Sequence, residues 1–148
     1  MKIATIAVAR LPLHGAAFAA ESFEFCPDEN TINAAGRFFL APTQSGQGEW
    51  LGMAPADSAG KIKGFVSAIF YPAEGSGIEK GQRSKCTYST EYSVQKRGVD
   101  MRYKPNQPSS VMLTNTSAWV KKTSSFGMSY YECTAPRAAQ CQFKELAH

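Results

Sequence analysis

The chain alternates apolar and polar residues over many short stretches, a pattern typical of half-buried β-strands. The clearest pair spans residues 86–92 and 99–103, which flank a Gln-Lys-Arg-Gly turn signal and predict a hairpin. In that hairpin, Val99, Met101 and Tyr103 are expected to face the core. Residues 86–92 carry alternate Cys, Tyr, Thr and Tyr side chains on one face.

Residues 62–71 show the strongest strand pattern of the chain. Strict alternation would put Phe65, Ser67, Ile69 and Tyr71 on one face and Val66, Ala68 and Phe70 on the other. Because both faces are largely apolar, we expect a central strand that is covered on both sides.

Shorter patterns predict the rest of a sheet. Residues 37–41 and 49–53 flank a Gly- and Gln-rich turn cluster at residues 44–48, which predicts another hairpin. Further strands are expected at residues 22–25, 111–113, 118–120, 127–133 and 140–144. The last two of these enclose a proline-containing loop between two cysteines, and we interpret them as a C-terminal hairpin closed by a disulfide.

Helical patterns are scarce. Pro27, Asp28 and Glu29 suit the first turn of a helix, so one or two helical turns are expected before Gly36. No amphipathic helix of about ten residues or more is indicated. The predicted fold is therefore all-β, a small antiparallel sandwich or barrel with a short N-terminal helical turn and two disulfides.

The N-terminus has the pattern of a secretory signal. Lys2 precedes an apolar run, and Ala17-Phe18-Ala19 forms a small-x-small cleavage site. We therefore expect a signal peptide at residues 1–19 and a single disulfide-bonded β domain at residues 20–148. The run is far shorter than the roughly 20 residues of a spanning helix, so no membrane insertion is expected after cleavage. A cytosolic chain with an N-terminal strand is the alternative.

Charge and composition narrow the classes of partner. The 148 residues carry 16 basic and 12 acidic side chains, a net charge of +4. Cleavage after Ala19 would remove Lys2 and Arg10 and leave a net charge of +2. Basic and acidic residues are interleaved along the chain, which favours a mixed-charge surface over a nucleic-acid groove.

The cysteines indicate two disulfides. Cys26, Cys86, Cys133 and Cys141 are an even number behind a signal sequence, and no CxxC pair or neighbouring histidine suggests a zinc site or another cofactor. Three pairings are possible. The short Cys133–Cys141 separation fits a hairpin closure, which leaves Cys26–Cys86 as the preferred second bridge.

Histidine usage restricts catalysis. After cleavage only His148, the last residue, would remain, so Ser-His, Cys-His and histidine-metal mechanisms lose their base or ligand. A carboxylate pair is the remaining option, with Glu49 beside Trp50 as the best candidate. Glu91, Asp100 and Glu132 are the possible partners of Glu49. No residue is assigned a catalytic role.

The order of motifs resembles a known family. It comprises an early Cys-Pro at Cys26-Pro27, a Gly-aromatic strand from Gly36 to Phe39, Trp50-x-Gly52, Cys86-x-Tyr88, a lone Trp119, and a terminal Cys133…Cys141-x-Phe143. This resembles a family of small exported bacterial proteins classed as a domain of unknown function. The resemblance implies export and disulfides and carries no established activity.

These features lead to one hypothesis and one alternative. The hypothesis is a non-enzymatic binding protein, periplasmic or secreted and monomeric, with a protein or glycan partner and no cofactor. It would inhibit or bind cell-envelope or host proteins through the loops at residues 44–48 and 72–81. One version is an inhibitor of a cell-wall hydrolase, because small periplasmic lysozyme inhibitors are similar in size, cysteine bridge and Tyr-rich face, although their signature loop is missing here. The alternative is a carboxylate-dependent enzyme that acts on glycans.

Overall fold

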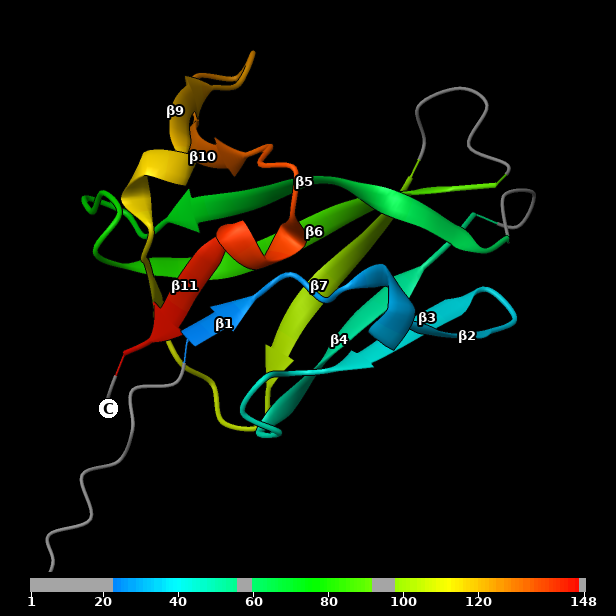
Figure 1. The fold of residues 1–148 in the computed structure, drawn as a ribbon. Coiled ribbons are helices and arrows are strands. Elements are labelled where there is room, and N and C mark those ends of the chain that lie inside the picture. Colours follow the sequence, from blue (N-terminus) through cyan, green and yellow to red (C-terminus); the bar gives the residue numbers. More distant parts are fainter. Residues whose placement is uncertain (1–22, 56–59, 92–97, 147–148) are drawn as a thin grey trace, which may run out of the picture.

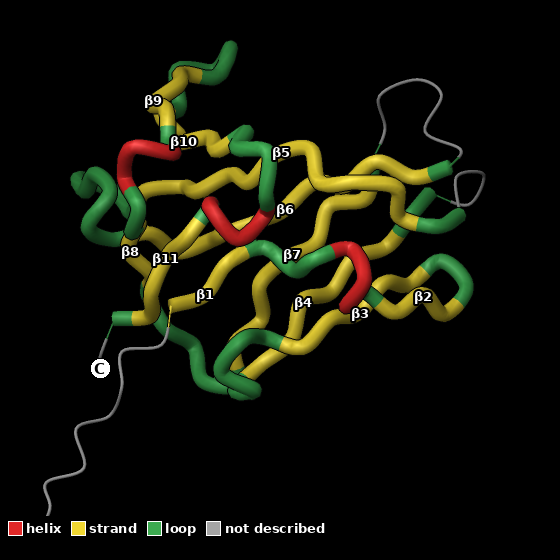
Figure 2. Tube along the Cα trace, viewed as in Figure 1, coloured by secondary structure: helices red, strands yellow, loops and turns green. Residues whose placement is uncertain are grey.

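The computed structural model describes residues 23–55, 60–91 and 98–146 and shows an all-β fold (Figures 1 and 2). The described strands are β1 (Phe23–Phe25), β2 (Asn33–Ala35), β3 (Phe38–Pro42), β4 (Gly48–Met53), β5 (Ile62–Pro72), β6 (Gly81–Thr90), β7 (Val99–Pro105), β8 (Val111–Leu113), β9 (Val120–Thr123), β10 (Ser129–Cys133) and β11 (Gln142–Glu145). Three 3₁₀ turns lie between them: η1 (Glu29–Thr31), η2 (Thr116–Ala118) and η3 (Ala138–Gln140). Across these ranges, no helix has the length and apolar character needed to cross a membrane.

The strands are arranged in two layers. The main sheet has the order β9-β10-β5-β6-β7-β4-β3-β2, and a small sheet has the order β1-β11-β8. All pairings are antiparallel, and the two sheets are connected where Gly81 at the start of β6 pairs with Val111 of β8. In Figure 1, β1 and β11 lie in front of the main sheet. The predicted all-β class with two disulfides is confirmed, and of the two expected architectures the structure is a sandwich.

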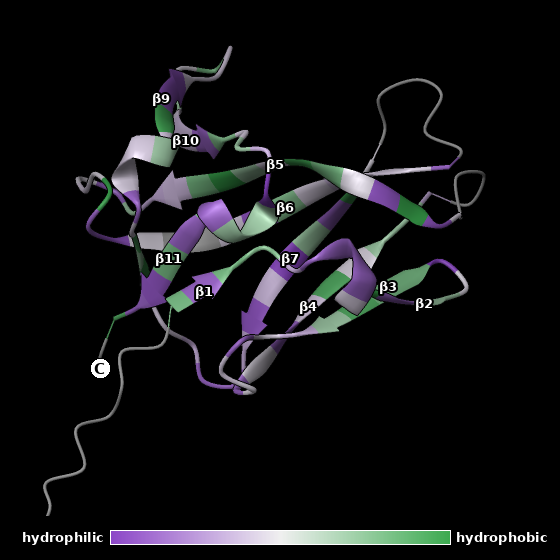
Figure 3. Ribbon diagram, in the orientation of Figure 1, coloured by the Kyte–Doolittle hydropathy of each residue, from purple (hydrophilic) through white to green (hydrophobic). Residues whose placement is uncertain are grey.

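Both predicted hairpins in the first two thirds of the chain are present. Strand β3 pairs with β4, and β6 pairs with β7, with Tyr88 opposite Val99 and Cys86 opposite Met101. As expected, Val99 and Met101 are buried, and Tyr103 packs against the core. Polar and apolar residues alternate along β7, which Figure 3 shows as bands of colour.

Strand β5 is central, with β6 on one side and β10 on the other. Its side chains do not follow the strict alternation that the sequence predicts. A register irregularity between Phe65 and Ser67 leaves Val66 unpaired and 49% exposed, while Phe65, Ala68 and Phe70 all contribute to the core. A bulge of this kind inserts one extra residue, so the residues on either side of it exchange faces.

The predicted C-terminal hairpin is wrong. Strand β10 pairs with β5 and β9, and β11 pairs with β1 and β8 in the other layer. The local hairpin is instead β9–β10, and residues expected as a strand at 118–120 are divided between η2 and β9. The physical reason is long-range pairing: β10 and β11 each find partners in a different layer, and the segment that contains η3 carries the chain between them.

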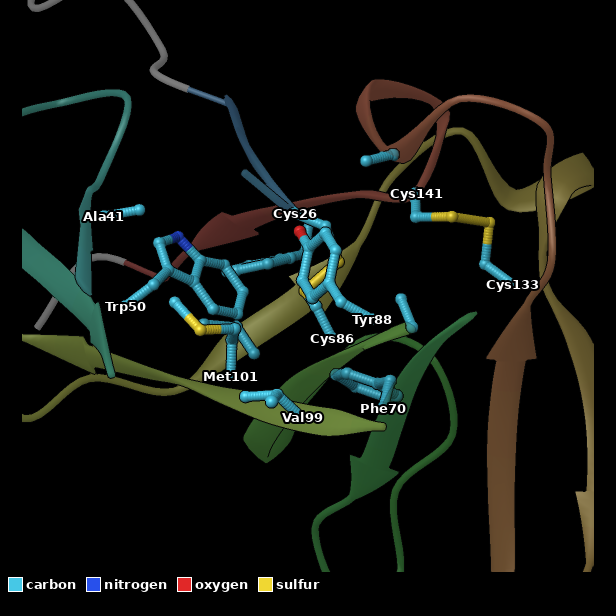
Figure 4. Close-up of a cluster of buried hydrophobic side chains, with 14 of the residues drawn as sticks. Cys26, Ala41, Trp50, Phe70, Cys86, Tyr88, Val99, Met101, Cys133 and Cys141 are labelled. Carbon is cyan, nitrogen blue, oxygen red and sulfur yellow. A yellow bond between two sulfur atoms is a disulfide. The ribbon is translucent and has the colours of Figure 1, made fainter. Parts of the chain in front are cut away.

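Both preferred disulfides are confirmed, and each one connects the two layers (Figure 4). Cys26 follows β1 directly and is bonded to Cys86 in the middle of β6. Cys133 ends β10 and is bonded to Cys141, which directly precedes β11. The shorter bridge therefore holds one sheet on the other rather than closing a hairpin.

The expected short N-terminal helical turn is present as η1. It is capped by the Asp28 side chain, which accepts a hydrogen bond from the Asn30 amide at 2.9 Å. The chain then enters β2, an edge strand that the sequence did not indicate, and turns at Gly36, whose φ of +63° favours glycine. Three exposed residues with no apolar alternation left no periodic signal for β2.

The core lies between the layers and is rich in aromatic side chains. The Trp50 ring lies 6.1 Å from Phe143 and 5.3 Å from Tyr103, centroid to centroid, so β4, β7 and β11 meet there. Figure 4 shows Trp50, Tyr88 and Phe70 in this interior. Fully burying a large apolar side chain stabilises a fold by roughly 1.5–3 kcal/mol, which makes this cluster a major source of stability.

Candidate binding surface

The acids considered for glycan chemistry are not gathered at one site. Glu49 is cross-strand from Lys104, and Asp100 lies four residues from Lys104 along β7. Since a strand rises about 3.3 Å per residue, Glu49 and Asp100 are about 13 Å apart along the sheet. Carboxyl pairs in glycoside hydrolases are separated by roughly 5–9.5 Å. Glu91 lies exposed in the turn after β6.

Two of these acids have cationic partners. Asp100 accepts hydrogen bonds from Lys85 Nζ at 2.9 Å and from Thr87 Oγ1 at 2.6 Å. Partial burial opposes ionisation of Asp100, but these two hydrogen bonds outweigh it and lower its pKa. Glu132 forms an ion pair with Lys122 at 3.1 Å. Both contacts lie between neighbouring strands and stabilise sheet register.

The outer face of the main sheet, the face turned away from the small sheet, carries a continuous row of paired residues. Leu51 of β4 is opposite Arg102 of β7, which is opposite Lys85 of β6, which is opposite Ile69 of β5. The inner residues of the same strands are buried under the small sheet. Successive positions of a strand point to opposite faces, which places the row on the side without a covering layer.

One end of this face is apolar. We use the name apolar strip for Phe38 and Leu40 of β3 with Leu51 and Met53 of β4, which pair as Phe38–Met53 and Leu40–Leu51. Phe38 is 51% exposed, Leu40 37% and Met53 58%. Contiguous exposed apolar residues on a folded protein mark interaction sites more often than isolated ones do.

Beside the apolar strip the surface is hollowed. This cationic hollow has a volume of about 700 Å³ and is lined by Leu51, Tyr71, Pro72, Ser84, Lys85, Arg102, Tyr103, Lys104 and Met128. Among the residues that the structure describes, its lining includes three cationic side chains and no carboxylate. Leu51 belongs to both features, so the strip and the hollow form one surface.

The β9–β10 turn borders the hollow. Ser124 and Met128 are joined by a backbone hydrogen bond of 2.8 Å, and Gly127 adopts a φ of +80° that favours glycine. Met128 lines the hollow, while Phe126 is 91% exposed. Figure 1 shows the hairpin standing away from the body of the fold. An aromatic side chain is thereby held in solvent next to the hollow.

The two loops that the sequence suggested as binding sites, residues 44–48 and 72–81, do not form this surface together. Of residues 72–81, Pro72 lines the hollow, and residues 73–80 form the connection between β5 and β6. The 44–48 turn lies near the small sheet, where the Gln44 amide donates to the Glu24 carboxylate at 2.9 Å. Sequence reasoning did not identify the residues of β7 that line the hollow. The outward positions of Arg102 and Lys104 in an alternating strand were the signal that could have indicated them.

A buried carboxylate on the inner side was also missed. Glu24 of β1 is only 4% exposed and accepts hydrogen bonds from Trp50 Nε1 at 3.2 Å and from the Gln44 amide. Burial raises the pKa of Glu24, and this effect outweighs the hydrogen bonds from Trp50 and Gln44. Nearby, Tyr103 donates to Glu145, and burial together with that carboxylate raises the pKa of Tyr103.

The described part of the chain contains no group of three or more His, Cys, Asp or Glu side chains able to hold a metal ion. Neither curated proteins nor solved structures gave a match to the chain. A family model described as a protein of unknown function, DUF3757, matches residues 20–144. The chain therefore belongs to the DUF3757 family.

Proposed function

We propose that this chain is an exported, non-enzymatic binding protein that docks a protein partner on the outer face of its main sheet. The observation that carries the proposal is the surface formed by the apolar strip and the cationic hollow. Phe38 and Met53 are more than half exposed, and they adjoin a hollow with cationic and aromatic walls.

The composition of this surface favours a protein partner. The centres of protein interfaces are enriched in aromatic residues, Met and Arg. The surface provides Phe38, Met53 and Arg102 within three neighbouring strands, and Tyr71 and Met128 at its other side. It is built on a sheet, so little backbone ordering is needed when a partner binds.

Export is supported by the covalent structure. Two disulfides form readily in an oxidising compartment, and both of them connect the layers of this fold. The family match begins at residue 20, directly after the expected cleavage site at Ala19. N-terminal sequencing of the protein from the cells that produce it should give a chain beginning at Ala20 or Glu21. A chain that retains Met1 would contradict export by this route.

Photo-crosslinking tests the binding surface. A benzoylphenylalanine in place of Met53 should give one discrete adduct in the producing cells or their medium. The same group in place of Gln107, an exposed loop residue that belongs to neither the apolar strip nor the lining of the hollow, is the matched control. Equal adducts from both positions, or none from Met53, would contradict the proposal. Turnover of muropeptides by the purified protein would instead favour the glycan-acting alternative.

A further inference from the structure

The spacing of two cations in the hollow matches an extended polypeptide. Arg102 and Lys104 are alternate residues of β7 and both side chains are exposed. At a rise of about 3.3 Å per residue, their attachment points are about 6.6 Å apart. Alternate side chains of any extended peptide have the same separation. A peptide lying along β7 could therefore present one side chain to each cation.

The positive charge of the hollow favours an anionic ligand. Lys85 is already paired with Asp100 at 2.9 Å. The charge of Arg102 helps to lower the pKa of Asp100, but neither Arg102 nor Lys104 forms a side-chain hydrogen bond or ion pair with the residues that the structure describes. Glu49, the cross-strand neighbour of Lys104, lies outside the lining of the hollow. Two cations are thus available to a ligand.

The walls of the hollow favour a polypeptide over an isolated anion. Leu51 lies on one side of Arg102, and Met128 with Tyr71 lies on the other side of the hollow. The Tyr71 ring packs near that of Tyr130, at 6.4 Å between centroids. These walls can contact the backbone and uncharged side chains between two carboxylates, and the planar guanidinium of Arg matches a carboxylate in two hydrogen bonds.

We propose that the cationic hollow binds an extended acidic segment of the protein partner, with carboxylates on alternate residues paired to Arg102 and Lys104. The inference rests on the proposed function and adds the chemistry of the partner. The segment runs along β7, and its flanking residues reach the apolar strip through Leu51.

The test uses a defined probe, the peptide acetyl-Glu-Ser-Glu-Ser-Glu-amide, titrated into the mature protein at low salt with backbone amide shifts as the readout. Shifts should concentrate on β7 and β6. The Gln-Ser-Gln-Ser-Gln peptide should give none. Replacing both cations, Arg102→Gln with Lys104→Gln, should weaken binding about tenfold. The control pair Lys61→Gln with Lys63→Gln removes the same charge from exposed positions outside the hollow and should leave binding unchanged.

Several results would overturn the inference. The first is that the acidic peptide causes no saturable shifts. The second is that the Lys61→Gln and Lys63→Gln control pair weakens binding as much as the Arg102→Gln and Lys104→Gln pair. The third is that inorganic phosphate or a galacturonate trimer binds more tightly than the peptide. The outcome is separable from that of the crosslinking experiment. A discrete adduct from Met53 without peptide binding would leave the docking surface in place and remove only the acidic segment.

Discussion

The indole Nε1 of Trp50 donates a hydrogen bond to the carboxylate of Glu24 at 3.2 Å, and this contact joins the small sheet to the main sheet. Glu24 lies on β1 and Trp50 on β4, and both side chains are buried. A buried carboxylate is costly in its charged form, so its protonation is coupled to folding.

This coupling predicts a pH dependence for Glu24. Its folded-state pKa is raised above 4.5, so its stabilising contribution is complete below about that pH and is lost as the pH rises through the folded pKa. The difference in unfolding free energy between the wild type and Glu24→Gln should therefore decrease from pH 4 towards pH 7. Denaturant titrations at several pH values measure it, and a difference that grows with pH would contradict the account.

Asp100 should show the opposite dependence at lower pH. Its folded-state pKa lies below 3.8, so its contribution is present above that value and is lost as the pH falls through the folded pKa. The wild type should lose its advantage over Asp100→Asn only on acidification below pH 4. The same titrations provide the check, and an advantage that grows as the pH falls would contradict the lowered pKa of Asp100.

The two disulfides should contribute unequally to stability. The Cys26–Cys86 bridge spans 60 residues and the Cys133–Cys141 bridge spans 8. Chain-entropy estimates give about 4 kcal/mol for the longer loop and about 2.5 kcal/mol for the shorter. Paired Cys→Ser replacement of Cys26 and Cys86 should lower the melting temperature more than replacement of Cys133 and Cys141. The reverse order would contradict the loop-entropy estimate and would show that holding β11 on the main sheet contributes more to stability.

Close packing at Gly81 offers a further test. A Cβ atom at this position would lie 2.3 Å from the Phe70 ring and 2.7 Å from the Tyr71 carbonyl oxygen. Gly81→Ala should therefore destabilise the protein by about 1–3 kcal/mol through overpacking. Gly64→Ala is the matched control, because its nearest neighbour would be Ser89 Oγ at 3.9 Å. Equal unfolding midpoints for the two variants would contradict this packing.

Sequence reasoning succeeded where local signals decide the structure. Alternation predicted the β3–β4 and β6–β7 hairpins, and the cysteine spacing favoured the bonds that form. It failed at Cys133–Cys141, because a separation of 8 residues suits a hairpin and a crossover between layers equally well. Only long-range pairing of β10 with β5 and of β11 with β1 distinguishes them.

The candidate site was harder to predict for a related reason. The alternation of β7 was sufficient to predict that Arg102 faces away from Val99 and Met101. Whether a second layer covers the face with Arg102 depends on where β1 and β11 pack. Glu24 illustrates the same limit. Simple alternation would turn the aromatic residues of β1 inward, whereas Phe23 is 45% exposed and Glu24 is buried beside Trp50.

The docking surface on the outer face of the main sheet is tested most directly by the yield of the Met53 crosslink in a Leu40→Glu background. Leu40 is 37% exposed in the apolar strip, so a charge there should leave the melting temperature within about 2 °C of the parent and reduce the adduct strongly. Ala139→Glu, at an exposed position of η3 outside both the strip and the lining of the hollow, should leave the yield unchanged. An undiminished adduct with Leu40→Glu, in a protein that remains folded, would contradict a partner bound at this surface.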